Sequence, residues 1–315
     1  MKNVYDGIIG LAIGDALGVP VEFQSRKNLI EAPVYSMREY GTHHQPVGTW
    51  SDDTSLTLAL VDSIIETKEI NYTDIMNKFT NWLLYQDYTA TGEVFDVGNS
   101  TSRAIINYGR GIEPIECGGI TENENGNGSL MRILPLAYYL HSQPDLTIEC
   151  QMDTIHKVSS LTHRHPISLI GCGLYIMIAQ NLLVGTTSLY ESIEQGVKEA
   201  FAYYDQKNYP EVQAYMRLRN LYNFSQLSST EIKSSGYVVD TLEAALWCLL
   251  TTTSYRECVL QAVNLGEDTD TVGAVCGGLA AIYYGVSAIP KEWLDCIARR
   301  SYIEGLCECL QNTLV

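Results

Sequence analysis

Apolar residues recur at helical spacing along most of the chain. Over residues 54–67 they stand four positions apart, as at Leu56 and Leu60, and the same spacing returns over 73–85 and 240–250. This is the spacing of one face of an α-helix. The pattern therefore predicts amphipathic helices over these three segments.

Two polar residues mark the start of the second of these helices, where Thr73 stands directly before Asp74. A threonine hydroxyl accepts a hydrogen bond from one of the first backbone N–H groups of a helix, and a carboxylate there is stabilised by the positive end of the helix dipole. We therefore expect Thr73 to be the N-cap of this helix.

The segment 167–184 is apolar over most of its length and is long enough to cross a membrane. Polar residues and glycines interrupt it, among them Ser168, Gly171 and Gln180, and no basic flank anchors it. A helix that is buried on most sides accounts for the same composition. We expect a core helix here and no membrane partner.

Convincing alternating strands are missing from the sequence. Glycine and proline clusters at 46–48, 109–119, 126–128 and 285–290 predict loops between helices instead. No linker, composition shift or repeat divides the chain. The sequence therefore predicts an all-α fold, a single compact multi-helix domain over residues 1–315.

The charge balance excludes one class of partner. The chain has 20 Lys+Arg against 37 Asp+Glu, a formal net charge of −17, and 46% of its residues are hydrophobic. This much apolar material is typical of a globular core. Because no run of Lys and Arg is present to neutralise phosphates, we expect no nucleic-acid partner. We take a monomer as the default state.

The cysteines and the first residues bear on the compartment. Nine cysteines without paired zinc spacing are typical of reduced thiols and not of a disulfide framework. Residues 1–6 lack the basic flank and the cleavage site of a signal peptide. We therefore expect a cytoplasmic protein.

Acids and hydroxyls gather in two stretches that lie far apart in the sequence. Residues 48–54 precede the apolar pattern of one predicted helix, and residues 266–271 precede a helix of small residues predicted over 272–284. Either stretch alone is also what a helix N-cap needs, but one cap requires one side-chain oxygen. The two stretches together supply six oxygen-bearing side chains: Ser51, Asp52, Asp53, Asp268, Asp270 and Thr271.

Carboxylate and hydroxyl oxygens are ligands of hard cations such as Mg²⁺, Mn²⁺ or Ca²⁺, whereas zinc favours His and Cys. We predict that the two stretches converge on a two-metal site. Paired ions of this kind orient a substrate, polarise an oxygen or hold an attacking water.

Two glycine-bearing stretches suggest close backbone approach and anion binding. Glycines recur every four residues over 10–18, which lets a helix or loop approach another backbone closely. Residues 125–132 form a flexible turn before an apolar helix, and backbone N–H groups in such a turn can face a phosphate. Neither stretch is a Walker loop or a dinucleotide-binding motif.

Two single residues are further candidates. Asp96 lies between a predicted helix and a glycine turn, so it is either a general acid/base or a helix cap. His163 either hydrogen-bonds a ligand or stays in the core. The local sequence leaves these alternatives open.

Seven stretches follow one another in the order of a known family. They are Gly14-Asp15-Ala16-Leu17-Gly18 with Glu22, Ser51-Asp52-Asp53-Thr54, Asp96 to Asn99, Asn127 to Arg132, Thr162-His163, Gly236-Tyr237, and Asp268-Thr269-Asp270-Thr271 with Gly277-Gly278. Together they resemble the ADP-ribosylglycohydrolase family over most of the chain.

The resemblance implies an all-helical fold with a central dinuclear metal cleft for two Mg²⁺ or Mn²⁺ ions. It also implies hydrolysis of the bond between the terminal ribose of ADP-ribose and an acceptor. The six oxygen-bearing residues above fall on the family's metal-ligand positions. Other matching residues are implied to bind the substrate: Glu22, Gly98, Asn99, Asn127, Gly128, Ser129, Met131, His163 and Tyr237.

The stretch 95–99 is similar to that of the arginine-directed members, whose aspartate is proposed to act in acid/base chemistry on the terminal ribose. We therefore favour a protein ADP-ribosylated on arginine as the substrate and ADP-ribose as the product, with Asp96, Asp53 and Asp268 as catalytic residues. Hydrolysis of serine-linked, O-acetyl- or poly-ADP-ribose stays open, and so do non-catalytic ADP-ribose binding and a nucleotide phosphohydrolase.

Two positions depart from the family's pattern. Ser51 stands where threonine is frequent, which keeps the hydroxyl, and Glu267 stands where glycine is common. Glu267 is expected to add a carboxylate beside Asp268.

Overall fold

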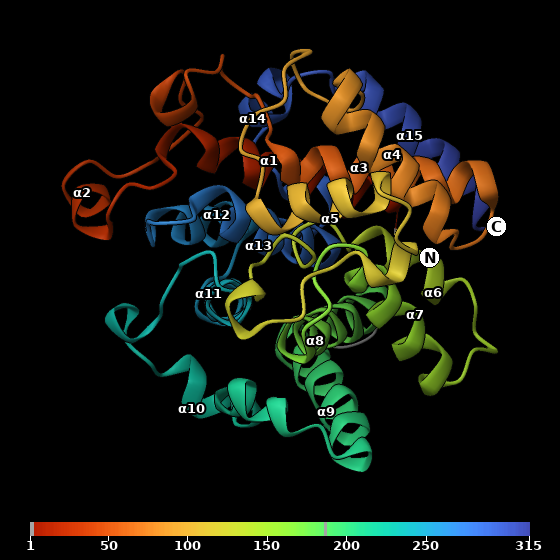
Figure 1. Cartoon of the computed structure of the whole chain (residues 1–315). Helices are drawn as coiled ribbons and strands as arrows, with labels where there is room; N and C mark the ends of the chain where they lie inside the picture. Colours follow the sequence, from red (N-terminus) through yellow and green to blue (C-terminus); the bar gives the residue numbers. More distant parts are fainter. Residues whose placement is uncertain (1–2, 186–187) are drawn as a thin grey trace.

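α-Helices make up most of the regular structure in the computed structural model, which describes residues 3–185 and 188–315 (Figure 1). Residues 1–2 and 186–187 of the predicted 1–315 domain lie outside the described residues. Within the described ranges no β-strand forms, and backbone pairing across loops is limited to isolated bridges. The prediction of an all-α fold is confirmed.

The α-helices are α1 (Val4–Gly18), α2 (Arg26–Glu31), α3 (Asp52–Thr67), α4 (Tyr72–Tyr85), α5 (Asn99–Gly109), α6 (Pro135–His141), α7 (Ile148–Ser160), α8 (Pro166–Val184), α9 (Leu189–Lys207), α10 (Leu221–Ser225), α11 (Val238–Thr251), α12 (Tyr255–Asn264), α13 (Thr269–Tyr284), α14 (Lys291–Cys296) and α15 (Arg300–Thr313). Short 3₁₀ turns join them: η1 (Val19–Val21), η2 (Gly41–His43), η3 (Pro114–Glu116), η4 (Glu122–Glu124), η5 (Pro210–Arg219), η6 (Ser229–Glu231) and η7 (Val286–Ala288).

The segments with helical spacing fold as expected, into α3, α4, α8, α11 and α13. The predicted N-cap of α4 is wrong. The helix begins at Tyr72 and its cap is Asn71, whose side-chain oxygen accepts a hydrogen bond from the backbone N–H of Asp74 at 3.0 Å. The amide oxygen of Asn71 does what was expected of the Thr73 hydroxyl, because the helix starts earlier than the apolar pattern indicates.

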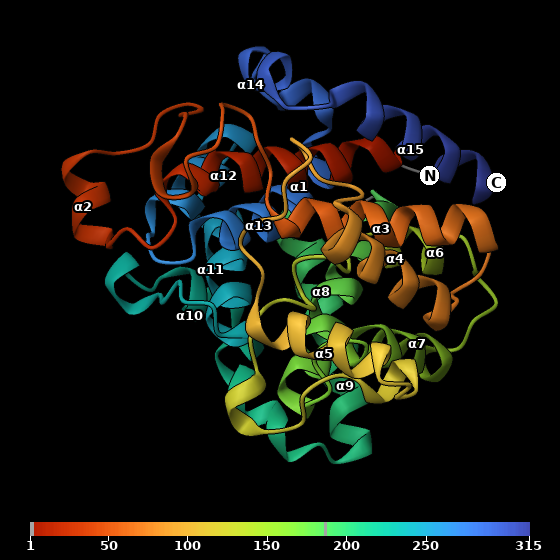
Figure 2. The same ribbon diagram turned by 45° about the horizontal axis from the view of Figure 1, so that its top comes forward.

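Helices α1 and α13 cross in direct backbone contact near the centre of the molecule (Figure 2). A Cβ atom placed on Gly14 would lie 2.0 Å from the carbonyl oxygen of Gly273, and one on Gly10 would lie 2.6 Å from that of Gly277. No side chain fits at either position. The glycine spacing over 10–18 therefore serves the close approach that the sequence predicts.

The other helices are arranged around this pair. Helices α3, α4 and α15 lie toward one side of the molecule, and α9 and α10 lie at the opposite end (Figures 1 and 2). The two ends of the chain are neighbours, since the backbone N–H of Val4 donates to the side-chain oxygen of Gln311 at 2.9 Å.

Among the described residues, two segments are long and apolar enough to cross a membrane, Val4–Val21 and Pro166–Val184. Inside the fold 89% and 78% of their residues, respectively, are buried. They are core helices here, and their burial accounts for their apolar composition.

We expect that replacing Gly14 by alanine lowers the free energy of unfolding by about 2–3 kcal/mol, because the added methyl group forces α1 and α13 apart. Urea denaturation measures the change. The matched control is Gly305→Ala in α15, where a Cβ meets nothing within 4 Å. That change should raise stability by about 0.5–1 kcal/mol. Equal effects at the two sites would contradict the role given to the crossing.

Candidate active site

The first acid cluster stands at the start of α3 and is held there by a residue of α1. The carboxylate of Asp15 accepts hydrogen bonds from the backbone N–H of Ser51 at 2.9 Å and from that of Thr54 at 3.0 Å. It also accepts one from the Thr54 hydroxyl at 2.6 Å. Ser51 is the N-cap of α3, its hydroxyl accepting from the N–H of Asp53. The interpretation of this stretch as a helix N-cap is therefore correct for Ser51. The hydrogen bonds to Asp15 fix the start of α3 to α1.

The second acid cluster, at the start of α13, reaches the first. Thr269 donates its hydroxyl proton to the carbonyl oxygen of Gly18 at 2.8 Å, which places the start of α13 against the end of α1. The Thr271 hydroxyl lies 3.5 Å from a carboxylate oxygen of Asp53. Carboxylate oxygens of Asp15, Asp53 and Asp270 lie within 4.8 Å of one another. The structure thus brings together the two stretches that the sequence separates.

A third segment adds Glu22, which follows η1. Carboxylate oxygens of Glu22, Asp268 and Asp270 form a second group within 4.8 Å. The backbone N–H of Phe23 donates to the carbonyl oxygen of Glu267 at 2.7 Å and joins the two loops that carry these acids. Glu22 is therefore positioned by main-chain contacts beside it.

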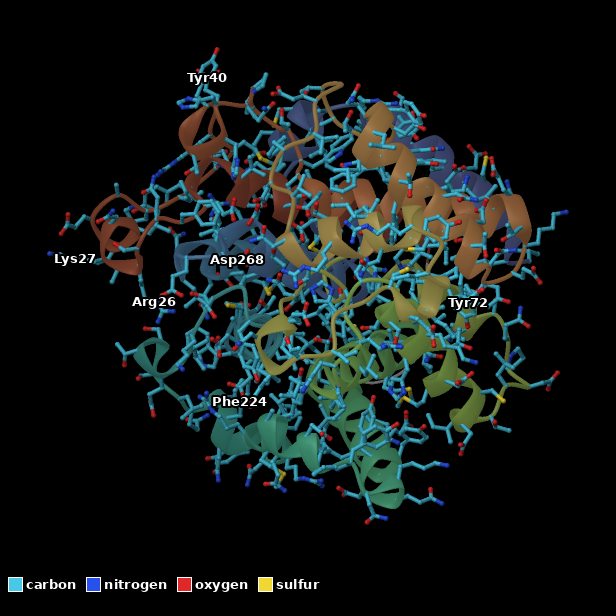
Figure 3. The ribbon with its side chains drawn as sticks, viewed as in Figure 1. Arg26, Lys27, Tyr40, Tyr72, Phe224 and Asp268 are labelled. Atoms are coloured by element: carbon cyan, nitrogen blue, oxygen red, sulfur yellow. The ribbon has the colours of Figure 1, made fainter. Side chains whose placement is uncertain are left out.

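Arg26, at the start of α2, supports the loop that leads to the second cluster (Figure 3). Its guanidinium donates to the carbonyl oxygens of Leu265 and Ile232, each at 2.7 Å. Figure 3 shows Asp268 further into the molecule than Arg26. The arginine thus acts on the backbone at the edge of the site and does not neutralise the acids.

The acids of the site are driven toward protonation when no cation is present. Burial raises the pKa of Asp15 to about 7, against the hydrogen bonds that it accepts. Burial, followed by nearby negative charge, raises the pKa of Glu22 to about 10. The pKa values of Asp52, Asp53 and Asp270 are also raised well above the usual value, first by burial and then by neighbouring carboxylates. Each shift reports a negative charge that lacks compensation.

Several carboxylate oxygens in this cluster have no hydrogen-bond partner within residues 3–185 and 188–315. They are Oδ1 of Asp53, Oδ1 of Asp268 and Oδ2 of Asp270, all of them buried. Buried polar atoms are nearly always satisfied, and these converge from two helix starts. An all-oxygen set of this kind fits a hard divalent cation.

Asp96 approaches the same acids from the loop between α4 and α5. Its φ angle of 53° lies in the left-handed region, which an aspartate tolerates better than most residues. Ligand atoms of Glu22, His43 and Asp96 lie within 4.8 Å of one another, and the Nε2 atom of His43 is hydrogen-bonded to Glu22. Burial raises the pKa of Asp96, and His43 opposes that shift.

These groups border a cleft of about 240 Å³. The wall of this cleft also contains the start of α5, through Asn99, Ser100 and Thr101, and the turn 126–128. The N-cap of α5 is Gly98, which has no side chain to accept from the first N–H groups. Those N–H groups are therefore free to meet an anion in the cleft.

The glycine turn is tied to the acid cluster and packed against His163. The side-chain amide of Asn127 donates to Oδ2 of Asp268 at 2.9 Å. A Cβ atom on Gly128 would lie 2.9 Å from Cε1 of His163 and 3.0 Å from the Thr101 hydroxyl oxygen. Glycine at this position lets the backbone approach the cleft wall closely.

Comparisons with known proteins agree with this architecture. The sequence profile of ADP-ribosylglycohydrolases matches residues 1–314. The chain belongs to the ADP-ribosylglycohydrolase family. It is 32% identical to ADP-ribosylarginine hydrolase Tri1 of Serratia proteamaculans (strain 568), over 96% of this chain and 77% of the relative. It is 30% identical to ADP-ribosyl-[dinitrogen reductase] glycohydrolase of Rhodospirillum rubrum, over 91% of this chain and 87% of that protein.

A solved structure shares the fold throughout. The structure titled ADP-ribosylglycohydrolase-related protein complex superposes with a TM-score of 0.81 at 28% identity, and the match covers 99% of this chain and 98% of the other. The family resemblance predicted from the seven stretches, and with it the prediction of a glycohydrolase enzyme, is confirmed.

In this ADP-ribosylglycohydrolase most predicted site residues border the cleft: Glu22, Asp52, Asp96, Gly98, Asn99, Asn127, Gly128, Met131, His163, Asp268 and Thr271. Ser51, Asp53 and Asp270 lie buried beside them at the helix starts. Their individual roles as ligands or catalysts stay predictions.

Two predicted substrate-binding residues are placed differently. The hydroxyl of Ser129 is fully buried and hydrogen-bonded to Ser159 and Cys172, so its side chain is turned away from the cleft toward α7 and α8. Its role in substrate binding stays a prediction, and with the hydroxyl turned inward the contact would come from its main chain. Tyr237 is 36% exposed and does not line the cleft, but its backbone pairs with Gly126 of the turn.

The expectation that Glu267 adds a carboxylate beside Asp268 is corrected. Its side chain is exposed, and it belongs to none of the acidic groups found among the described residues. Its φ angle is 64°, which explains why glycine suits this position. Glu267 therefore matters here for its backbone conformation.

Sequence reasoning missed Asp15 and His43 as parts of the site. An aspartate inside an otherwise apolar helix was the available signal for Asp15, because such a charge needs partners from elsewhere in the fold. His43 gave no local signal, since its place beside Glu22 depends on the path of the chain between α2 and α3.

We expect Mg²⁺ to stabilise the protein more at about pH 8 than at about pH 5.5. The aspartates of the unfolded chain titrate near pH 3.9. In the folded, metal-free protein the pKa values of the buried aspartates are raised, so the folded state binds more protons than the unfolded chain. The free energy of unfolding therefore falls as pH rises from about 4 to 7 and above. Bound Mg²⁺ removes the repulsion that causes this fall. Melting temperatures measured with EDTA and with Mg²⁺ check this, and an equal Mg²⁺ effect at both pH values would contradict it.

We expect Asp270→Asn to have opposite effects on the two forms. Removing one of the mutually repelling charges should stabilise the metal-free protein by about 1 kcal/mol, while the increase in melting temperature on adding Mg²⁺ is largely lost. Thermal unfolding with and without Mg²⁺ measures both effects. Glu267→Gln is the matched control, because that carboxylate lies outside the cluster, and it should leave the Mg²⁺ effect unchanged. A variant at Asp270 that keeps the full Mg²⁺ effect would exclude this residue as a ligand.

Proposed function

We propose that this protein is a metal-dependent ADP-ribosylarginine hydrolase. It cleaves the N-glycosidic bond between ADP-ribose and an arginine side chain of a modified protein, and releases ADP-ribose. The position of Asp96 carries the proposal, since this partly buried carboxyl group, whose pKa is raised by burial, lines the cleft beside the acid cluster. The names of the relatives from Serratia proteamaculans and Rhodospirillum rubrum support the same chemistry. The nine free cysteines fit a reducing cytoplasm.

Two divalent cations, Mg²⁺ or Mn²⁺, complete the site. The residues that hold them are Ser51, Asp52, Asp53, Asp268, Asp270 and Thr271, and Asp15 keeps the first of these segments in place. When bound, such ions supply positive charge and orient the oxygens of the substrate and of water. The unpartnered carboxylate oxygens support this assignment.

The reaction exchanges one bond for another. The bond from the anomeric carbon of the terminal ribose to the guanidine nitrogen breaks, and a bond from that carbon to a water oxygen forms. The leaving nitrogen gains a proton and the water loses one. Asp96 can serve both transfers, because its raised pKa favours the protonated form that donates to the leaving nitrogen, and the resulting carboxylate can take a proton from the water. Glu22 and His43 lie close to this carboxyl group, with ligand atoms of the three residues within 4.8 Å of one another.

The part of the cleft wall formed by α5 and the glycine turn binds the diphosphate. The open start of α5 and the turn around Gly128 present backbone N–H groups to the cleft. These donors suit an anionic ligand without placing a cationic side chain beside the acids.

We expect Asp96→Asn to slow release of ADP-ribose from arginine by about 10²- to 10⁴-fold, because the proton donor is lost while the cleft keeps its shape. Asp268→Ala should abolish the Mg²⁺-dependent release. Chromatography of released ADP-ribose from an arginine-modified protein measures both. Glu267→Gln, next to Asp268 but outside the cleft, should keep the rate of the unchanged protein.

The same enzyme preparation should be given serine-linked ADP-ribose, O-acetyl-ADP-ribose and poly(ADP-ribose). Release confined to the arginine linkage supports the proposal. Faster release from one of the other substrates would reassign the linkage, phosphate release would indicate a nucleotide phosphohydrolase, and ADP-ribose binding without turnover would indicate a binding protein.

A further inference from the structure

A line of buried polar groups runs behind the cleft wall and ends at His163. The guanidinium of Arg132 donates from Nη2 to the hydroxyl oxygen of Thr162 at 2.8 Å. The same hydroxyl lies 2.9 Å from Nδ1 of His163. Arg132 and Thr162 are fully buried and His163 is 2% exposed. The three side chains come from two separate segments, the one after the glycine turn and the one after α7.

The donors in this line determine which ring nitrogen carries the proton. A guanidinium has only N–H donors, so the Thr162 oxygen must accept from Arg132. The hydroxyl proton of Thr162 then points to Nδ1 of His163, its one neighbouring acceptor among the described residues. With the opposite assignment Nδ1 would carry the hydrogen, and the hydroxyl proton would be buried without an acceptor, which is costly. Nδ1 is therefore the acceptor and Nε2 carries the hydrogen.

The Nε2 atom faces the substrate side. His163 lines the cleft, and a Cβ atom on Gly126 would lie 3.4 Å from Nε2. Within residues 3–185 and 188–315, Nε2 has no hydrogen-bond partner. It is not one of the fully buried unpartnered atoms, so a ligand in the cleft can reach it. Its N–H is thus a donor that awaits a ligand.

His163 stays neutral in this environment. Burial, followed by the positive charge of Arg132, lowers the pKa of His163 to about 3. Arg132 itself keeps its charge at neutral pH, since burial lowers its pKa only to about 10. Two of its nitrogens, Nε and Nη1, have no partner among the described residues. Its guanidinium carbon lies 4.7 Å from the centre of the Phe79 ring. The charge is therefore not cancelled by a carboxylate.

We infer that Arg132 and Thr162 are positioning residues that hold His163 as an Nε2–H tautomer, so that it donates a hydrogen bond to an acceptor oxygen of the ADP-ribose. The ligand in this inference rests on the proposed function, whereas the tautomer does not. The charge of Arg132 polarises the Thr162 hydroxyl, which strengthens its bond to Nδ1 and makes Nε2–H the better donor. His163 is then neither a general base nor a metal ligand.

Nuclear magnetic resonance of the whole protein with ¹⁵N-labelled histidine tests the tautomer. A two-bond ¹H–¹⁵N correlation spectrum distinguishes a ring nitrogen that carries hydrogen from one that does not, and a His163→Gln variant assigns the signal among the six histidines. We expect a bare Nδ1 and a hydrogen on Nε2. A hydrogen on Nδ1, or a charged ring at neutral pH, would overturn the inference without any other variant.

Thr162→Val and Thr162→Ser form the matched pair for the positioning role. Valine has the same shape without the hydroxyl, so His163 should change to the Nδ1–H form or to a mixture, and ADP-ribose should bind about five- to tenfold more weakly. Serine keeps the hydroxyl and should restore both the spectrum and the affinity measured by titration calorimetry. A loss of stability alone, with the tautomer unchanged in the valine variant, would contradict the role.

The two proposals fail in different ways. If the unchanged protein shows the Nε2–H tautomer but does not bind ADP-ribose, the ligand assignment falls together with the proposed function and the positioning of His163 is upheld. If it binds and hydrolyses its substrate while His163 carries its hydrogen on Nδ1, the inference falls and the proposed function is upheld.

Discussion

The contact between the backbones of α1 and α13 is the constraint on which the site depends. Because Gly14 and Gly273 have no side chains, the end of α1 lies against the start of α13, where Asp270 is found. The same end of α1 carries Asp15, which fixes the start of α3. One helix thus determines the position of both acid clusters. A larger residue in the crossing would separate the two acid clusters, which also meet where the Thr271 hydroxyl approaches Asp53.

The contact between α1 and α13 places mutually repelling carboxylates in the interior of the protein, where water cannot screen their charges. Buried carboxylates at Asp52, Asp53 and Asp270 would destabilise any fold that had no compensating charge. The positive ends of α3 and α13 offset a part of this repulsion, since both helices begin at the clusters. The rest is left for protons or for cations. The proposed affinity for metal ions and the expected loss of stability without them therefore have one cause, the same buried carboxylates.

The sequence predicts what is encoded locally and misses what the fold brings together. Helical spacing and the acids at helix starts are local, so the helices and the candidate ligands could be named in advance. Asp15 could not be assigned its role, because its partners Ser51 and Thr54 lie at the start of α3, far from it in the sequence. For the same reason the direction of the Ser129 side chain could not be predicted, because its partners Ser159 and Cys172 lie on distant helices.

No Lys or Arg is found among the described residues that line the cleft, and the chain as a whole carries a net charge of −17. Long-range attraction of phosphates by side-chain charge is therefore weak. The positive potential comes instead from short-range sources: the start of α5, the turn at Gly128 and the buried charge of Arg132, to which the proposed cations would add. A ligand gains from all of them only if its diphosphate and its terminal ribose reach these groups and the acid cluster at once. Selectivity then follows from the shape and the spacing of the ligand's oxygens, and not from its charge.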